Sequence, residues 1–335
     1  MLDPLHKTAL SIELCSFSDV DKLIDFIDQN WKKNHIFTKD RKLFDWQHRG
    51  VRKYNFVLAK EMNEIVGILG YIPTSHYSDL LSKNNLLWLA IWKIKDGVKK
   101  PGLGLIMLNY LKKIYRNPKI CSIGLSREVI PIYKALGFNV GVLSHRAFFN
   151  QFCKEFMIGK PDSSYLTPIK KNNLTFRVST KVSKIPDRYF DKYPSKNSDY
   201  LINRYVNHPR YNYKFIYIYE NKSLLSVSVF REINLNSTKV GRIVDSFGAN
   251  IMISKFNFVI SVFLRDFNYE YLDIVSNMDC DKYSGFIDAS DSIIIPNYFE
   301  PFLKENISID YAYKSEERLV IFRGDSDQDR PSYST

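Results

Sequence analysis

The stretch of sequence that most constrains the fold is residues 88–138. Apolar runs at 88–94 and 120–123 predict two strands. Between them, residues 105–115 place apolar side chains at helical spacing, and a second helix follows the second strand and ends in Gly137-Phe138. This alternation of strands and helices predicts an α/β fold.

A glycine turn opens the first of these helices. Residues 99–104 read Lys-Lys-Pro-Gly-Leu-Gly, so Gly102 and Gly104 lie directly at the predicted helix start. Glycine lets the backbone approach a ligand closely, and a helix N-terminus attracts anions through its free N–H groups. Lys99 and Lys100 add two cations. We interpret the turn as a cradle for a pyrophosphate, with a simple turn as the alternative.

These elements resemble the core of the GNAT superfamily, the acyl-CoA-dependent N-acyltransferases. The turn is similar to the superfamily's Arg/Gln-x-x-Gly-x-Gly/Ala loop, with Lys99 where Arg or Gln is usual. In GNAT proteins the strand before this loop splays from its neighbour and pairs with the pantetheine arm like an added strand. The resemblance implies acetyl-CoA (coenzyme A) as acyl donor, bound by Ile91, Trp92, Lys93, Ile94, Lys99, Lys100, Gly102, Leu103, Gly104 and Ser126.

The second helix carries the candidate catalytic acid. Residues 132–138 read Ile-Tyr-Lys-Ala-Leu-Gly-Phe and match the family pattern Leu-Tyr-Glu-Lys-Leu-Gly-Phe closely. In many family members this tyrosine protonates or hydrogen-bonds the leaving thiolate, and a phenol is a suitable acid for that step. We therefore predict a catalytic role for Tyr133, against the alternative that it is a packing residue.

Acceptor contacts are expected between the first helix and the hairpin predicted at residues 54–72, which turns at 61–64. The superfamily often places its acceptor pocket in this region. His35 and His48 are candidate bases, because imidazole titrates near neutral pH, although a packed structural role is the alternative for both. Trp46 offers a ring that could stack on a sugar or nucleobase.

The second half of the chain repeats the order of elements. A strand at 174–180, a hairpin turning at 221–223, a strand at 240–247, a helix at 254–267 and a strand at 271–275 follow one another. The resemblance thus implies two tandem GNAT-like domains, each a mixed, mostly antiparallel twisted sheet flanked by helices. We predict a CoA-binding domain at 1–160, a linker at 161–173 and a degenerate domain at 174–335.

The second domain keeps only Gly248 where a glycine pair would be needed, so we expect it to contribute to the acceptor site instead of binding CoA. Its candidate substrate-binding residues are Arg204, His208 and Asp245, since arginine can hold the phosphates of a nucleotide-linked sugar. Residues 323–331 resemble a tail of acyltransferase-like proteins from bacterial surface-polysaccharide gene sets. Asp325, Asp327 and Asp329 mimic a calcium loop without its later glutamate, and no metal is predicted.

Composition limits the partners and the cellular compartment that can be predicted. The net charge of +12 is spread without a run of five or six basic residues, so no nucleic-acid partner is predicted. Four scattered cysteines and the lack of a secretory signal in residues 1–20 favour a cytoplasmic protein. No apolar stretch reaches the roughly 20 residues of a membrane span.

The hypothesis is an N-acetyltransferase that moves the acyl group of acyl-CoA to the amine of a small polar acceptor by direct attack. The best candidate acceptor is a nucleotide-linked amino sugar for O-antigen or capsule biosynthesis. Two alternatives remain: a tandem GNAT-type transferase that uses aminoacyl-tRNA, and a non-catalytic GNAT-like binding protein. The oligomeric state is not predicted.

Overall fold

The structure is a computed structural model that describes residues 10–166, 168–190, 196–235, 237–297 and 303–331. Residue 167 of the predicted linker therefore lies outside the described part. The strands are β1 (Leu10–Leu14), β2 (Phe56–Glu61), β3 (Glu64–Pro73), β4 (Leu86–Ile94), β5 (Lys119–Ile123), β6 (Asn139–Phe149), β7 (Thr175–Ser179), β8 (Tyr213–Glu220), β9 (Ser223–Leu235), β10 (Thr238–Gly248), β11 (Tyr271–Ser276), β12 (Phe286–Asp288) and β13 (Ile309–Lys314). The helices are α1 (Val20–Phe26), α2 (Ile36–Lys39), α3 (Arg41–His48), α4 (Leu103–Ile114), α5 (Ile130–Ala135), α6 (Ser198–Leu201) and α7 (Asn257–Phe267).

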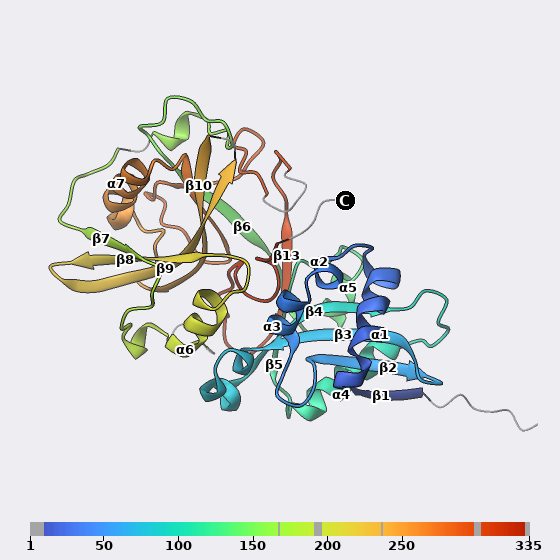
Figure 1. Cartoon of the computed structure of the whole chain (residues 1–335). Coiled ribbons are helices and arrows are strands. Elements are labelled where there is room, and N and C mark those ends of the chain that lie inside the picture. Colours follow the sequence, from blue (N-terminus) through green and yellow to red (C-terminus); the bar gives the residue numbers. More distant parts are fainter. Residues whose placement is uncertain (1–9, 167, 191–195, 236, 298–302, 332–335) are drawn as a thin grey trace, which may run out of the picture.

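The strands form one continuous mixed sheet that runs through two lobes (Figure 1). Their order is β1-β2-β3-β4-β5-β13-β6-β11-β10-β9-β8-β7, with β12 paired to β6. Most neighbours are antiparallel, and the two parallel pairs are β4 with β5 and β10 with β11. Each lobe thus contains one parallel pair, which confirms the predicted tandem repeat and the mostly antiparallel sheet.

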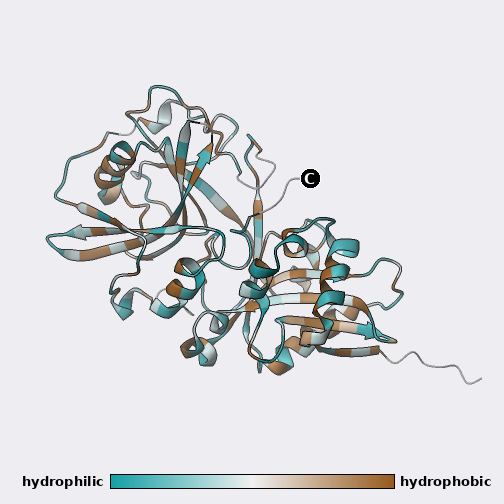
Figure 2. Ribbon diagram, in the orientation of Figure 1, coloured by the Kyte–Doolittle hydropathy of each residue, from teal (hydrophilic) through white to brown (hydrophobic). Residues whose placement is uncertain are grey.

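The sheet of the first lobe is covered on both faces. Strand β2 is buried at its first four residues, and its side chains alternate between two apolar clusters. Phe56 and Leu58 lie in the cluster that contains α1 and α3, whereas Val57 and Ala59 lie in the cluster that contains α4. Hydrophobic residues accordingly run along the strands of this lobe (Figure 2).

Both predicted hairpins are confirmed. Strands β2 and β3 turn at Met62 and Asn63, and β8 and β9 turn at Asn221 and Lys222. All four turn residues have positive φ, which suits the twist of a tight hairpin. The repeat extends to the first helix of each lobe, since α1 and α6 each continue into a five-residue π-helical turn, at Ile27–Trp31 and Ile202–Val206.

The two lobes exchange strands across the predicted domain limits. The first half of β6 pairs with β13, and its second half pairs with β11 in the other lobe. A single strand, β6, spans residues 139–149 and therefore belongs to both lobes. Strand β13, near the C-terminus, lies between β5 and β6 and completes the sheet of the first lobe. The predicted domain boundaries, with a linker at 161–173, remain a prediction. Strands β6 and β13 each pair with strands from the other side of that linker.

Candidate acyl-CoA site

The two parallel strands of the first lobe separate at their carboxyl ends. Strands β4 and β5 pair from Leu86 with Lys119 to Leu89 with Ser122. Strand β4 then continues through residues 90–94, and the described strands give this segment a partner on its β3 side alone. Backbone N–H and C=O groups on the other edge are therefore available to a ligand that pairs like an added strand.

Helix α4 begins next to this free edge. Gly102 is its N-cap and has φ of +77°, a left-handed conformation that favours glycine. Gly104, two residues further on, faces Trp92 of β4 so closely that an added Cβ would lie 3.1 Å from the indole Nε1. The glycine pair thus has two functions, because Gly102 makes the turn and Gly104 lets the helix approach the splayed strand.

The lysines near this turn differ in whether they already form an ion pair within the protein. Lys100 forms an ion pair with Glu61, and Lys93 forms one with Asp96 at 2.6 Å. Lys99 is exposed and has no hydrogen bond or ion pair with any residue that the structure describes. Of the two predicted cations of the cradle, Lys99 is therefore the free one.

Tyr133 lies where β4 and β5 separate. Its side chain is 3% exposed, and its hydroxyl hydrogen-bonds the Ser122 side chain at the end of the paired region. Its ring contacts Trp92 edge-on, with centroids 6.2 Å apart, and Phe138 at 5.0 Å. Burial raises the pKa of Tyr133 to about 12, and the bond to Ser122 offsets part of that rise. The hydroxyl is accordingly protonated at neutral pH, as a proton donor must be.

The side chains of the other predicted cofactor residues either pack in the apolar clusters or are exposed to solvent. Ile91 and Leu103 are buried in the apolar clusters on the two sides of the sheet. Ile94 is half-buried, and its side chain packs beside Met107 of α4. Ser126 is exposed ahead of α5, and its side chain hydrogen-bonds the Glu128 carboxylate. Ile91 and Ile94 both belong to the segment of β4 that has a free edge.

The two candidate base histidines are buried. His35 is 4% exposed, its Nε2 lies 2.9 Å from Arg330 Nη2, and burial together with the Arg330 charge lowers its pKa to about 3. His48 is fully buried among Phe37, Phe44 and Phe56, and burial holds its pKa well below the usual value. Both rings are neutral at neutral pH, and their role as a base remains a prediction.

Three of the four predicted acceptor residues meet between the lobes. Trp46 of α3 lies edge-on to His208, with ring centroids 4.4 Å apart, and its Nε1 donates to Asn203 O at 3.3 Å. The guanidinium carbon of Arg204 lies 5.1 Å from the Trp46 ring centre and 5.5 Å from that of Tyr77. Sequence reasoning chose these side chains separately, and the fold places them in contact.

Arg204 is the buried cation of this group. It is 1% exposed, and its Nη2 donates to the carbonyls of Gly324 at 2.9 Å and Ser326 at 3.1 Å. Its Nε and Nη1 have no partner among the described residues, nor does Nε2 of the neighbouring His208. The cation is therefore balanced by aromatic rings and carbonyl oxygens, and not by a described carboxylate.

Asp245 belongs to a different, fully buried group. Its carboxylate accepts hydrogen bonds from Lys196 Nζ at 2.9 Å and from the Tyr205 hydroxyl at 2.9 Å. Lys196 also pairs with Asp325 at 2.8 Å. Burial raises the pKa of Asp245 to about 6, with Lys196 opposing the rise. This arrangement attaches the C-terminal segment to the second lobe.

The C-terminal segment 323–330 reaches both parallel strand pairs, which sequence reasoning did not foresee. In the second lobe, Arg323 N donates to Val275 O and Gly324 N donates to Val244 O, each at 3.0 Å. These carbonyls directly follow the last paired residues of β11 and β10. The main chain therefore occupies the gap of the second lobe that corresponds to the free edge of β4.

The same segment then continues to the first lobe. Gln328 Nε2 donates to Ile123 O at 3.1 Å, and Ser326 Oγ donates to Leu89 O at 3.5 Å. Asp327 is 5% exposed and pairs with Arg330 at 2.9 Å. The segment thus contacts the inner end of the gap between β4 and β5. The spacing of Asp325, Asp327 and Asp329 in the sequence gave no indication of these contacts.

Within the described ranges, no group of three or more histidine, cysteine, aspartate or glutamate side chains is arranged to hold a metal ion. No helix in the described part has the length and apolar character that crossing a membrane requires.

Comparisons with solved structures identify the fold. A GCN5-related N-acetyltransferase from Anabaena variabilis aligns with 91% of this chain and 72% of its own, with a TM-score of 0.57 and 10% sequence identity. A conserved protein of unknown function from Enterococcus faecalis, named as a probable N-acyltransferase, covers the same shares with a TM-score of 0.52 and 8% identity. No protein-family model and no curated protein match the chain. The chain therefore has a GNAT-type fold, in two tandem copies.

Proposed function

We propose that this protein is an acyl-CoA-dependent N-acyltransferase with acetyl-CoA as its donor. The observation that carries the proposal is the free edge of β4 at residues 90–94, which lies between the glycine turn of α4 and the buried Tyr133. An extended pantetheine arm needs an unpaired strand edge, a pyrophosphate needs a helix N-terminus, and a departing thiolate needs a proton donor. These three features converge on Trp92, which contacts both Gly104 and Tyr133.

In the proposed reaction the acceptor amine attacks the thioester carbonyl directly. When bound, acetyl-CoA supplies the activated acyl group. Backbone N–H groups of residues 91–93 polarise the carbonyl, the new C–N bond forms as the C–S bond breaks, and Tyr133 gives its proton to the sulfur. The proton of the amine leaves through water or a histidine, and the water route agrees with the burial of His35 and His48.

We further propose a nucleotide-linked amino sugar as the acceptor, in the synthesis of a surface polysaccharide such as O-antigen or capsule. Support comes from the Arg204 guanidinium, which has two unpaired nitrogens and no acidic partner among the described residues, beside the flat ring of Trp46. Arginine binds phosphate through such a fork. If this is correct, Arg204→Met raises the KM of a uridine-diphosphate amino sugar at least tenfold and leaves that of the free amino sugar unchanged. An equal effect on both acceptors would contradict this assignment.

The test of donor binding is calorimetric titration with acetyl-CoA, with tRNA as a competitor. The wild-type protein should bind one equivalent, and the double variant Gly102→Val, Gly104→Val should not, because valine strains the turn and collides with Trp92. Gly97→Val is the matched control, since Gly97 also has a positive φ (+85°) and open space around it. If wild-type protein does not bind acetyl-CoA, or the double variant binds as well as the control, the proposal fails.

A further inference from the structure

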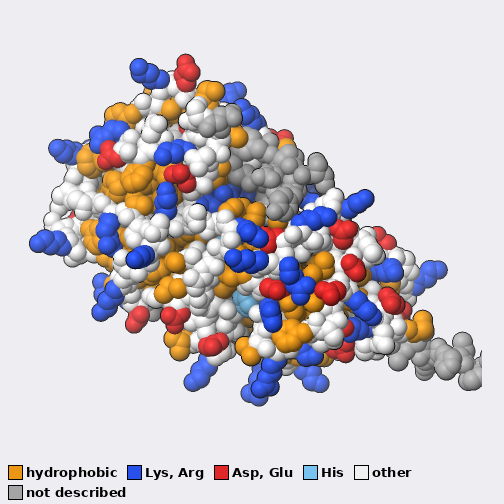
Figure 3. Space-filling view, viewed as in Figure 1, with side chains coloured by type: hydrophobic (Ala, Val, Ile, Leu, Met, Phe, Trp, Pro, Cys, Tyr) orange, Lys and Arg blue, Asp and Glu red, His pale blue; other side chains and the backbone are white. Residues whose placement is uncertain are grey.

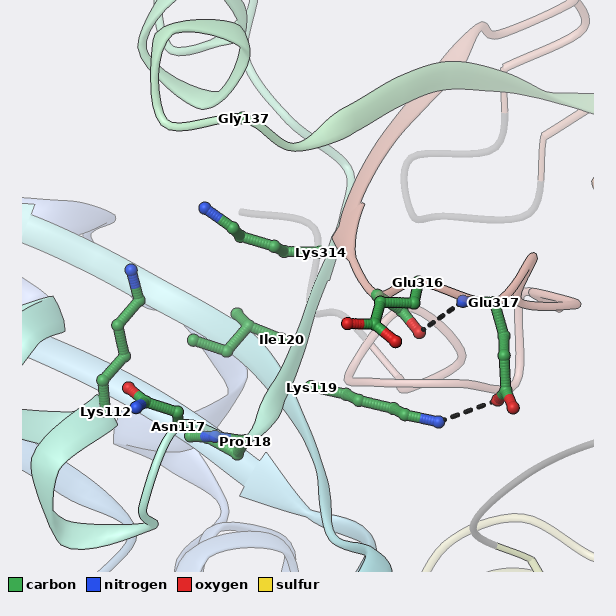
Figure 4. Close-up of a pocket in the computed structure, with 10 residues that line it drawn as sticks. Lys112, Asn117, Pro118, Lys119, Ile120, Gly137, Lys314, Glu316 and Glu317 are labelled. Carbon is green, nitrogen blue, oxygen red and sulfur yellow. Dashed lines mark hydrogen bonds and ion pairs between the residues drawn. The ribbon is translucent and has the colours of Figure 1, made fainter.

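A cavity of about 620 Å³ lies at the opposite end of α4 from the glycine turn. Its walls come from the C-terminal end of α4, the start of β5, the turn after α5 and the end of β13 (Figure 4). Lys112 in this wall is eight residues beyond Gly104, or about 12 Å along the helix axis. The cavity is therefore separate from the candidate acyl-CoA site, and its volume is in the range of small-molecule sites.

Two ammonium groups point into this cavity from different elements. Lys112 extends from α4 and Lys314 from the end of β13, on two sides of Ile120 (Figure 4). Among the described residues, Lys112 Nζ has no hydrogen bond or ion pair, and Lys314 Nζ donates only to the Leu136 carbonyl at 2.7 Å. Burial and the Lys314 charge lower the pKa of Lys112. Like charges in this position are unfavourable unless an anion lies between them.

The cavity wall also contains polar side chains that can form hydrogen bonds with a ligand. Glu316 has its carboxylate toward the cavity and makes no hydrogen bond or ion pair with a described residue (Figure 4). The nearby Glu317 is already paired, with Lys119 at 2.9 Å. Asn117 adds an amide to the wall. The described lining residues include no aromatic side chain, so the cavity offers hydrogen bonds to hydroxyl groups but no surface on which a base would stack.

We propose that this cavity binds a small phosphorylated polyol such as a sugar phosphate. The phosphate lies between Lys112 and Lys314, and the hydroxyl groups donate to Glu316 and contact Asn117. A dianionic phosphate balances both ammonium groups at once, which a single carboxylate does not. A nucleotide fits less well, because its base has no aromatic partner here.

The test is calorimetric titration of the full-length protein with glucose 6-phosphate and, separately, with inorganic phosphate. The wild-type protein should bind one equivalent of glucose 6-phosphate more tightly than inorganic phosphate. The double variant Lys112→Met, Lys314→Met should bind it at least tenfold more weakly. Lys113→Met is the matched control, since Lys113 is the exposed neighbour on the same helix and does not line the cavity.

A second variant tests the organic part of the ligand. Glu316→Gln should retain affinity for inorganic phosphate and lose at least half of the preference for glucose 6-phosphate. Equal affinity of the wild-type protein for both probes, no saturable binding of either, or full binding by the double variant would each overturn the proposal.

Discussion

Tyr133 is the residue on which the proposed chemistry depends most. It belongs to α5, yet it contacts β4 through Trp92 and β5 through Ser122, so its buried hydroxyl lies where the two strands separate. Its raised pKa keeps the proton on the oxygen throughout the neutral range. A buried phenol in this position is suited to donate a proton once, to an anion that forms next to it.

Tyr133→Phe should lower kcat about 100-fold and leave the Kd of acetyl-CoA unchanged, because the ring still packs against Trp92 and only the proton donor is lost. Steady-state kinetics and calorimetry measure the two quantities. Tyr110→Phe, on α4, is the control and should keep the wild-type kcat. An unchanged kcat in Tyr133→Phe would remove Tyr133 from the mechanism.

For the acceptor site, the residue types could be predicted from the sequence, but their proximity could not. Trp46, Arg204 and His208 were selected for their chemistry, and the structure brings them within contact distance. Their proximity had no signal in the sequence, because Trp46 and Arg204 belong to different lobes and no local pattern links them. The burial of His35 was equally hidden, because its partner Arg330 comes from the far end of the chain. The rings around His48 belong to neighbouring residues, Phe37, Phe44 and Phe56, but the sequence does not show that they enclose it.

At the scale of elements, locally determined features were predictable. The hairpins, the glycine-capped α4 and the helix that carries Tyr133 each follow from neighbouring residues. The position of β13 and of segment 323–330 did not follow, because strand pairing depends on contacts hundreds of residues apart. Strand β13 is as short and amphipathic as many edge strands, yet it pairs on both sides, with β5 and β6.

The C-terminal segment should be a strong determinant of stability. Asp329 is 1% exposed, and it accepts hydrogen bonds from Arg231 Nε at 2.9 Å and from the Tyr213 hydroxyl at 2.7 Å. Asp329→Ala leaves a buried arginine without its carboxylate and should lower the free energy of unfolding by about 3–5 kcal/mol. Urea denaturation measures the change.

An exposed arginine–aspartate pair is the control for Asp329→Ala. Asp279 pairs with Arg318 at 3.0 Å on the surface, and Asp279→Ala should change stability by less than about 1 kcal/mol. If the two variants were destabilised equally, the buried contacts of Asp329 with Arg231 and Tyr213 would not stabilise the protein as described.

At the scale of the whole molecule, the basic charge is diffuse. On the face shown in Figure 3, lysine and arginine side chains are spread over both lobes with acidic side chains among them. Several titratable side chains are buried instead, among them His208 and Asp245, and their burial makes the free energy of unfolding dependent on pH.

His208 illustrates that dependence. Burial, Arg204 and Arg231 lower the pKa of His208 to about 3, and Asp329 and Asp40 oppose the shift. Between pH 6.5 and 3 the unfolded state binds a proton that the folded state does not, so stability falls as pH decreases through this window. From pH 7 to pH 5 the loss from one such histidine is about 2 kcal/mol.

His208→Asn should reduce the loss of stability between pH 7 and pH 5 by about that amount. Asparagine does not titrate, and its Oδ1 can replace Nδ1 as acceptor for the Arg210 and Tyr211 N–H groups. Urea denaturation of both proteins at the two pH values gives the difference. The same pH dependence in variant and wild type would show that His208 is not buried in its neutral form.

The most direct test of the acyl-CoA site is backbone hydrogen exchange with and without acetyl-CoA. We expect slower exchange at residues 90–94 of β4 and at the first turn of α4, because the ligand occupies the free strand edge and the helix N-terminus. Residues 244–248 of β10 should not change, since segment 323–324 already occupies the corresponding gap. Protection at 244–248, or no protection at 90–94 under saturating acetyl-CoA, would contradict the proposed site.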